Sequence, residues 1–270
     1  MRQVPEAAMK FNDFKRKKEQ QSKISMLTCY DYPSACMISE SNIDCVLVGD
    51  SVAMAVHGHD STIMATLEMM CLHTAAVSRG LKGRFLISDL PFLCHRESIA
   101  NTIQNVKPLL QAGAQAIKIE GGDRDACQTI AYLVTAGVPV MGHIGLTPQS
   151  VLQLGGYRIQ GRAEEEAAAL IQQAKNLEAA GCFALVIECV PATVAKAITN
   201  ALSIPTIGIG AGVETDGQVL VWHDMLGLQT EFKPRFVKSF ADGKTVLLAG
   251  INAFADDVHR AHFPTADHAF

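Results

Sequence analysis

The chain has 270 residues, 49% of them hydrophobic, and its 23 Lys and Arg against 27 Asp and Glu give a net charge of −4. These values exclude a disordered or fibrous chain and give no reason to expect nucleic-acid binding. No apolar stretch reaches the roughly 18 residues of a membrane span, no apolar signal core lies near the N-terminus, and the eight cysteines form no C-x-x-C pair. We therefore expect a cytoplasmic protein with no membrane partner.

Eight short apolar segments, rich in Val, Ile and Leu, predict strands that are buried on both faces, as in a parallel sheet covered by helices. They lie at residues 24–30, 45–49, 84–89, 116–120, 138–142, 184–188, 206–210 and 219–222. Helical patterns occupy residues 67–78, 98–112, 123–136, 163–180 and 192–201. Strands that alternate with helices predict the α/β class and a (β/α)8 TIM barrel, with an open doubly wound sheet as the alternative.

Both ends of the chain carry further helical patterns. Phe11 and Phe14 are spaced to pack one face of a short N-terminal helix on the body, with a basic outer face. A helical segment follows residue 228 and ends in the polar residues 265–270. Because no linker, repeat or charge block divides the sequence, we predict a single domain over residues 1–270.

Charged side chains stand at the ends of several predicted strands. Asp50, Asp89 and Glu120 end three successive strands, so a closed barrel would place them side by side at its carboxyl end, where parallel α/β folds bind their ligands. Three hard oxygen ligands suit Mg²⁺, which would also offset their mutual repulsion. We therefore expect a metal site at these three residues.

Further candidates follow from side-chain direction. Lys118 lies two residues before Glu120 and points to the same face, where it would bind an anionic substrate or form a Schiff base. Glu188 ends a later, otherwise apolar strand, which suits a general base. His143 would polarise a group or shuttle a proton, unless it is a structural histidine.

A different interpretation starts from the sequence His57-Gly-His59-Asp60. Together with Lys118, His143 and residues 223–224, it suggests a binuclear metallohydrolase barrel. However, the His-x-His sequence lies beyond its strand in a loop, and the sixth strand ends in Glu188 where such an enzyme needs a histidine.

Eleven stretches carry a resemblance that runs in order over about residues 24–240. They are residues 28–32, 48–51, 58–62, 89–92, 118–122, 142–150, 156–161, 187–191, 207–212, 215–218 and 223–224. In these stretches the chain closely resembles the ketopantoate hydroxymethyltransferase family.

The resemblance implies a barrel of the phosphoenolpyruvate/pyruvate superfamily and an enzyme of pantothenate biosynthesis. Such an enzyme adds the one-carbon unit of 5,10-methylenetetrahydrofolate to 3-methyl-2-oxobutanoate, through an enolate that Mg²⁺ stabilises, and gives 2-dehydropantoate. Members form large cytoplasmic homo-oligomers, commonly decamers, so a homodecamer is expected.

The resemblance also implies residue roles. Asp50, Asp89 and Glu120 match the metal-associated carboxylates. Ser51 and Lys118, together with Asp50 and Asp89, match the contacts to the keto acid. Glu188 matches the proton acceptor.

The chain departs from the family pattern at Ala53 and His57, where relatives more often have glycine and an uncharged residue. Two further alternatives stay open. A Mg²⁺-dependent 2-oxo acid lyase or mutase of the isocitrate lyase type would share the enolate, although the cysteine-containing loop of those enzymes is missing. A keto-acid sensor would lack at least one of the five charged residues 50, 89, 118, 120 and 188, and all are present.

Overall fold

The computed structural model describes residues 9–229 and 234–270. Eight parallel strands pair in chain order and close into a barrel, because the last strand pairs with the first. The strands are β1 (Ile24–Thr28), β2 (Cys45–Val48), β3 (Phe85–Asp89), β4 (Ala116–Glu120), β5 (Val140–Gly145), β6 (Ala184–Glu188), β7 (Thr206–Ile209) and β8 (Gly217–Leu220). The predicted (β/α)8 TIM barrel is confirmed, and the open sheet is excluded.

The last strand begins two residues earlier than the sequence predicts. The apolar run suggested residues 219–222, whereas β8 begins at Gly217, opposite Ile24 of β1. A Cβ atom at Gly217 would collide with the carbonyl oxygen of Ile24, so only glycine lets the two backbones approach this closely. Hydrophobicity does not reveal a strand that starts on such a residue.

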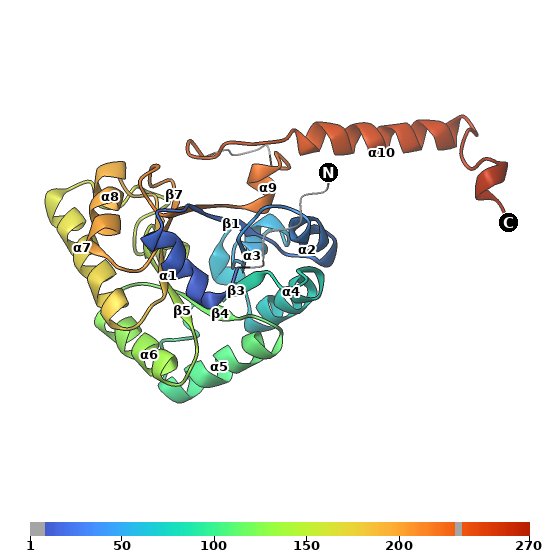
Figure 1. The fold of residues 1–270 in the computed structure, drawn as a ribbon. Helices are drawn as coiled ribbons and strands as arrows, with labels where there is room; N and C mark the ends of the chain where they lie inside the picture. Colours follow the sequence, from blue (N-terminus) through green and yellow to red (C-terminus); the bar gives the residue numbers. More distant parts are fainter. Residues whose placement is uncertain (1–8, 230–233) are drawn as a thin grey trace. The chain divides into compact units, whose positions relative to one another are not determined.

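The five predicted helices between the strands are confirmed, and they surround the barrel in Figure 1. They are α4 (Leu67–Gly80), α5 (Ile99–Gln111), α6 (Arg124–Thr135), α7 (Glu164–Ala179) and α8 (Ala192–Ala201). The side chains of Thr66, Ser98 and Asp123 accept hydrogen bonds from the first turns of α4, α5 and α6, so local sequence decides where these helices begin. Two shorter helices, α2 (Tyr32–Ser39) and α3 (Val52–Ala55), follow β1 and β2.

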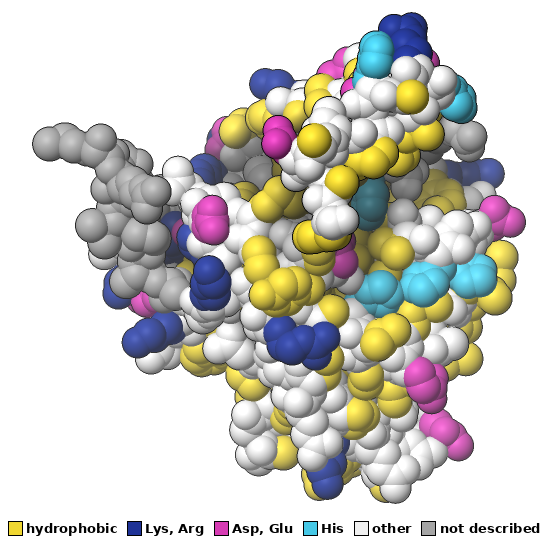
Figure 2. Space-filling view, turned by 90° about the vertical axis from the view of Figure 1, so that its right-hand side faces the viewer, with side chains coloured by type: hydrophobic (Ala, Val, Ile, Leu, Met, Phe, Trp, Pro, Cys, Tyr) yellow, Lys and Arg dark blue, Asp and Glu magenta, His cyan; other side chains and the backbone are white. Residues whose placement is uncertain are grey.

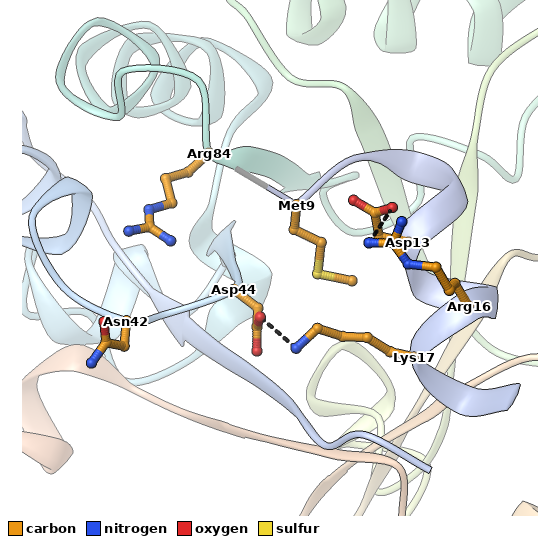
Figure 3. A pocket seen from close by; sticks show the side chains of 7 residues that line it. All are labelled: Met9, Asp13, Arg16, Lys17, Asn42, Asp44 and Arg84. Carbon is orange, nitrogen blue, oxygen red and sulfur yellow. Dashed lines mark ion pairs between the residues drawn. The ribbon is translucent and has the colours of Figure 1, made fainter. Parts of the chain in front are cut away.

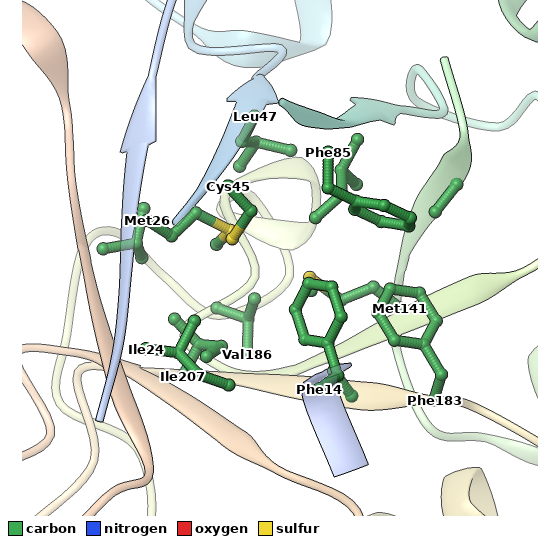
Figure 4. Packing of buried hydrophobic residues seen from close by; sticks show 14 of the residues in the cluster. Phe14, Ile24, Met26, Cys45, Leu47, Phe85, Met141, Phe183, Val186 and Ile207 are labelled. Atoms are coloured by element: carbon green, nitrogen blue, oxygen red, sulfur yellow. The ribbon is translucent and has the colours of Figure 1, made fainter. Parts of the chain in front are cut away.

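The predicted short N-terminal helix is present as α1 (Phe11–Glu19), and it closes the amino end of the barrel. Phe14 is 1% exposed, and its ring centroid lies 5.2 Å from that of Phe85 and 4.9 Å from that of Phe183. Figure 4 shows Phe14 among inward-facing residues of several strands, including Met26, Cys45 and Ile207. The amino half of the barrel is therefore a packed apolar core.

The chain divides into two compact units, Met1–Val221 and Trp222–Phe270. The first contains the barrel. The second contains α9 (Trp222–Met225) and α10 (Gly243–His259), which is the predicted C-terminal helical segment. The single domain over residues 1–270 stays a prediction. Over residues 9–229 and 234–270, no helix is both long and apolar enough to cross a membrane.

Candidate active site

A pocket at the carboxyl end of the barrel brings together every site residue that the sequence predicts. Strands β2, β3, β4, β5 and β6 contribute one or more of them, within their carboxyl halves or just after their last residues. They are Asp50, Ser51, Asp89, Lys118, Glu120, His143 and Glu188. The prediction that the strand ends converge on one site is therefore confirmed as geometry, while the chemical role of each residue stays a prediction.

Lys118 is the centre of charge pairing in this pocket. Its Nζ lies 3.0 Å from Asp89 Oδ1 and 3.9 Å from Glu120 Oε1, and all three side chains are at most 5% exposed. Burial alone would lower the pKa of Lys118, but the negative charges of Asp89, Glu120 and Asp50 outweigh it and raise the pKa above its usual range. An amine that is paired with two buried carboxylates suits the binding of an anion better than a Schiff base.

Backbone and side-chain amide N–H groups donate a hydrogen bond to one oxygen of each of the three acids Asp50, Asp89 and Glu120. The backbone N–H of Asp50 donates to Asp89 Oδ2 at 3.0 Å. Gln149 holds the other two, since its Nε2 donates to Asp50 Oδ2 at 2.8 Å and its backbone N–H donates to Glu120 Oε2 at 3.0 Å. The sequence did not single out Gln149, which lies within the matching stretch 142–150 but carries no charge.

The three acids differ in how they are compensated. Burial raises the pKa of Asp50 well above its usual range, and the neighbouring charges of Asp89 and Glu120 raise it further. Burial also raises the pKa of Asp89, against the opposing effect of Lys118. For Glu120 burial is outweighed by His143, Lys118 and the Gln149 backbone N–H, so its pKa is lowered. The pocket holds more negative than positive charge and would gain from a cation.

His143 bridges the buried acids to Glu188. Its Nδ1 lies 3.3 Å from Glu120 Oε1 and its Nε2 lies 3.3 Å from Glu188 Oε2. Burial and Lys118 lower the pKa of His143, but the two glutamates outweigh them and raise the pKa to about 9. The imidazole thus links two acids, whose side chains are 4% exposed for Glu120 and 18% exposed for Glu188.

The backbone around Glu188 has an unusual conformation. Its carbonyl oxygen accepts a hydrogen bond from the Leu146 N–H at 2.8 Å, and a Cβ atom at Gly145 (φ 93°) would collide with that same oxygen. The next residue, Cys189, has a φ of 48°, which is strained for a side chain other than glycine. Strain of this kind is typical of functional sites, and here it lies next to Glu188.

Ser51 is oriented by a residue that the sequence did not single out as a site residue. Its Oγ lies 2.8 Å from the hydroxyl oxygen of Tyr30, which follows β1. Tyr30 is 1% exposed, and burial raises the pKa of its phenol, which keeps it a neutral hydrogen-bonding group. Two neighbouring strands thus place one hydroxyl beside Asp50.

The His-x-His pair of the metallohydrolase interpretation lies outside the pocket, although His143 lines it. His57 and His59 are exposed, and neither lines the pocket. Instead, His57 Nε2 lies 2.8 Å from His73 Nε2 of α4, and the rings of His57 and His59 stack 6.5 Å apart. Histidine side chains lie in a row on the face that Figure 2 shows. The binuclear interpretation therefore loses the ligands on which it rests.

The described parts of the chain contain no group of three or more His, Cys, Asp or Glu side chains arranged to hold a metal ion. Two buried oxygens, Asp89 Oδ1 and Glu120 Oε1, nevertheless lack a hydrogen-bond donor. Their nearest nitrogen neighbours are Lys118 Nζ, 3.0 Å from Asp89 Oδ1, and His143 Nδ1, 3.3 Å from Glu120 Oε1.

A second cavity lies at the opposite, amino end of the barrel, beside α1 (Figure 3). Lys17 Nζ is 2.6 Å from Asp44 Oδ1, and Arg16 is 3.0 Å from Asp13. Arg84 donates hydrogen bonds to backbone carbonyl oxygens between the end of α2 and the start of β2, including that of Ile43 at 2.6 Å. The charged side chains that line this cavity are thus held by ion pairs or, for Arg84, by hydrogen bonds to the backbone.

The profile of the family described as ketopantoate hydroxymethyltransferase matches residues 8–266. The chain belongs to this family. A protein of Legionella pneumophila (strain Paris) named 3-methyl-2-oxobutanoate hydroxymethyltransferase is 67% identical over 262 residues, which are 97% of this chain and all of that protein. A protein of the same name from Coxiella burnetii (strain CbuK_Q154) is 49% identical over 257 residues, 95% of this chain and 97% of that protein. The predictions of the family and of an enzyme, a hydroxymethyltransferase, are confirmed.

Solved structures of other enzymes share the barrel of this ketopantoate hydroxymethyltransferase family member. Phosphonopyruvate hydrolase in complex with oxalate and Mg²⁺ has a TM-score of 0.64 at 11% identity, over 96% of this chain and 93% of that one. The 2,3-dimethylmalate lyase, a member of the PEP mutase/isocitrate lyase superfamily, has a TM-score of 0.57 at 16% identity, over 96% and 90%. At these identities the likeness shows the fold alone.

Proposed function

We propose that the chain transfers the one-carbon unit of 5,10-methylenetetrahydrofolate to 3-methyl-2-oxobutanoate and gives 2-dehydropantoate for pantothenate biosynthesis. The Legionella and Coxiella relatives bear the name of such an enzyme. The observation that carries the proposal is the meeting of Lys118, the buried acids and Glu188 around one pocket. Deprotonation of a 2-oxo acid needs a proton acceptor and compensation for the negative charge that develops on oxygen, and these groups supply both.

We propose Mg²⁺ as the cation of the site, held by Asp50, Asp89 and Glu120. The buried oxygens Asp89 Oδ1 and Glu120 Oε1, which lack hydrogen-bond donors, support this assignment, because hard oxygen ligands suit Mg²⁺. Mg²⁺ usually takes one or two protein carboxylates and completes its shell with water and substrate, so a preformed cage of three residues is not required. When bound, Mg²⁺ would supply a Lewis acid that stabilises negative charge on the substrate oxygen.

Glu188 is the proton acceptor in this proposal. Its side chain is 18% exposed, against 3% for Asp89 and 4% for Glu120, so it is the acid that a substrate in the pocket can reach. It takes the proton from C3 of the keto acid and leaves an enolate. His143 orients Glu188 and compensates its charge before the transfer.

Lys118 and Ser51 bind the keto acid. The protonated amine of Lys118 adds positive charge beside the developing oxyanion, and the Ser51 hydroxyl, held by Tyr30, provides a hydrogen bond. C3 of the enolate then forms a bond to the methylene carbon carried by the folate. This bond replaces the bond from the methylene carbon to one folate nitrogen, and that nitrogen takes up the proton held by Glu188. Water then displaces the second folate nitrogen, leaving its hydroxyl group on the carbon and its proton on the nitrogen. Tetrahydrofolate leaves, so no nucleophilic side chain of the protein is needed.

The first test follows the exchange of the C3 proton of 3-methyl-2-oxobutanoate for deuterium by NMR. We expect exchange that requires Mg²⁺, is abolished by EDTA and falls at least about 100-fold in Glu188→Gln, the loss typical of a missing general base. Glu165→Gln, the same change at an exposed position of α7, should exchange at the wild-type rate.

Adding 5,10-methylenetetrahydrofolate to the same reaction tests the transfer. Formation of 2-dehydropantoate supports the full proposal. Exchange without product would move the function to another enolate enzyme, such as one of the isocitrate lyase type. Neither exchange nor product from folded protein would refute the proposal.

We also propose that the enzyme is a homodecamer in the cytoplasm, as its family resemblance implies. Sedimentation velocity should then give ten times the chain mass of 29.0 kDa. A dominant species of any other mass would contradict the decamer.

A further inference from the structure

Gln149 links three elements of the pocket although it belongs to none of the strands. It lies in a short 3-10 turn, η2 (Pro148–Ser150), after β5, and it is 5% exposed. Its side-chain Nε2 donates to Asp50 Oδ2 at 2.8 Å and to the Leu90 carbonyl oxygen at 3.0 Å. Its backbone N–H donates to Glu120 Oε2 at 3.0 Å. One residue therefore contacts the ends of β2, β3 and β4.

The amide of Gln149 can take only one orientation. Both hydrogens of Nε2 are used, one by Asp50 and one by Leu90, and the backbone N–H of Leu90 donates in turn to the Lys118 carbonyl oxygen at 3.0 Å. A flipped amide would present its oxygen to two acceptors. The carboxylate of Asp50 is thus held against a rigid part of the barrel.

These hydrogen bonds sort the carboxylate oxygens into two sets. Neutral N–H groups hold Asp50 Oδ2, Asp89 Oδ2 and Glu120 Oε2, and Gln149 supplies two of these three donors. The opposite oxygens of Asp89 and Glu120 are buried without a donor. The opposite oxygens face Lys118 Nζ at 3.0 Å from Asp89 Oδ1 and His143 Nδ1 at 3.3 Å from Glu120 Oε1. The N–H donors therefore decide which oxygen of each acid is turned toward the charged groups of the pocket.

We propose that Gln149 is a positioning residue that presents Asp50 and Glu120 to the divalent cation of the reaction. The inference rests on the proposed function, because it assumes that these acids hold a cation. Groups that orient metal ligands commonly change metal affinity by about 10- to 100-fold when they are removed. We expect a loss of this size in variants that keep the backbone N–H but lose the reach of the side-chain amide.

The test measures Mn²⁺ binding by the EPR signal of the free ion, with no substrate present. Mn²⁺ is the probe because it accepts the same octahedral oxygen ligands as Mg²⁺. The variants are Gln149→Met, which has a similar length and no donor, and Gln149→Asn, whose amide is one methylene too short. Gln153→Met, at an exposed position four residues further on, is the matched control.

We expect the Mn²⁺ dissociation constant to rise about 10- to 100-fold in both Gln149 variants and to stay within twofold of wild type in Gln153→Met. In the exchange assay, the Mg²⁺ concentration for half-maximal rate should rise by the same factor. Excess Mg²⁺ should restore the rate, which no loss of folded protein could imitate. Thermal unfolding in EDTA checks that each variant is folded, and Gln149→Asn keeps the test open if Gln149→Met does not fold.

Two outcomes overturn the inference in distinguishable ways. If wild type binds Mn²⁺ and both folded Gln149 variants bind it equally well, Gln149 does not position the acids, and the proposed function stands. If wild type binds no Mn²⁺ and shows no Mg²⁺-dependent exchange, the inference falls together with the metal site of the proposed function.

Discussion

The two ends of the barrel handle buried charge in opposite ways. At the amino end, Lys17 forms an ion pair with Asp44, and Arg84 donates hydrogen bonds to backbone carbonyl oxygens. The core of the barrel at this end is apolar and includes Phe14. At the carboxyl end, several acids share a single lysine. Within the described residues of the barrel unit, every buried side-chain nitrogen or oxygen without a hydrogen-bond partner belongs to residues at the carboxyl end, namely Thr62, Asp89, His95, Glu120 and His143.

The two ends of the barrel therefore serve different purposes, one for the stability of the fold and the other for function. Paired charges and packed rings stabilise a fold but leave nothing for a ligand to satisfy. Buried polar atoms without partners destabilise the folded state, and they are retained where a substrate or cation completes them. The amino end therefore holds the barrel together, and the carboxyl end is built for chemistry.

Lys118→Met should produce the largest effect of any change that tests this contrast. It removes the ammonium that lies 3.0 Å from Asp89 and leaves this buried acid without its positively charged partner. We expect a loss of about 3–5 kcal/mol in unfolding free energy in EDTA, as when one partner of a buried pair is removed. Exchange at C3 should be lost as well. Urea unfolding measures the first effect, and an unchanged midpoint would contradict the charge argument.

Phe14→Ala should separate the two ends, because it removes only apolar packing at the amino end. Truncating a buried phenylalanine costs about 3–5 kcal/mol, and Phe14 is 1% exposed. The exchange rate and its Mg²⁺ dependence should stay at wild-type values in the protein that remains folded. Phe11→Ala is the milder control, since Phe11 is 44% exposed. A change in Mg²⁺ dependence in Phe14→Ala would show that the ends are coupled.

His95, a buried side chain at the carboxyl end of the barrel, should make the stability of the protein depend on pH. It lies in the loop after β3, is 5% exposed, and has no hydrogen-bond partner at either ring nitrogen. Burial, together with Arg96, lowers its pKa from 6.5 to about 4. The unfolded chain therefore takes up the proton first as the pH falls, so this contribution to stability is complete above pH 6.5 and is lost between pH 6.5 and 4.

The variant His95→Phe cannot take up this proton. Between pH 6.5 and 4, wild type should lose about 3 kcal/mol more unfolding free energy than His95→Phe, measured by urea unfolding at several pH values. Parallel curves for the two proteins would show that His95 is not buried in its neutral form.

The sequence predicts the barrel well because strands buried on both faces appear in it as continuous apolar runs. The helices between them appear as segments in which apolar residues recur with the period of an α-helix. It also predicts that Lys118 and Glu120 share a face, because side chains alternate along a strand. These inferences need only local periodicity and the closure of the barrel. They suffice to bring the acids, Lys118 and Glu188 to one end.

The contacts that orient these groups could not be predicted in the same way. Gln149 reaches Asp50 from a loop, and its reach depends on the turn at Pro148 rather than on any period. Tyr30 lies beyond the end of β1 and meets Ser51 only because β1 and β2 are neighbours. Pairwise contacts between loops and strand ends leave no spacing in the sequence, so they appear only in three dimensions.

Lys17→Met gives the smallest expected effect and completes the comparison with Lys118→Met. The substitution is the same, and Lys17 also has a carboxylate neighbour, with Nζ 2.6 Å from Asp44. However, the two side chains are 21% and 17% exposed, so water can solvate Asp44 when the lysine is removed. We expect a loss of about 0–1 kcal/mol in urea unfolding and an unchanged exchange rate. A loss as large as that of Lys118→Met would contradict this comparison. It would mean that the deeper burial of Lys118 does not make its ion pair more important for stability than that of Lys17.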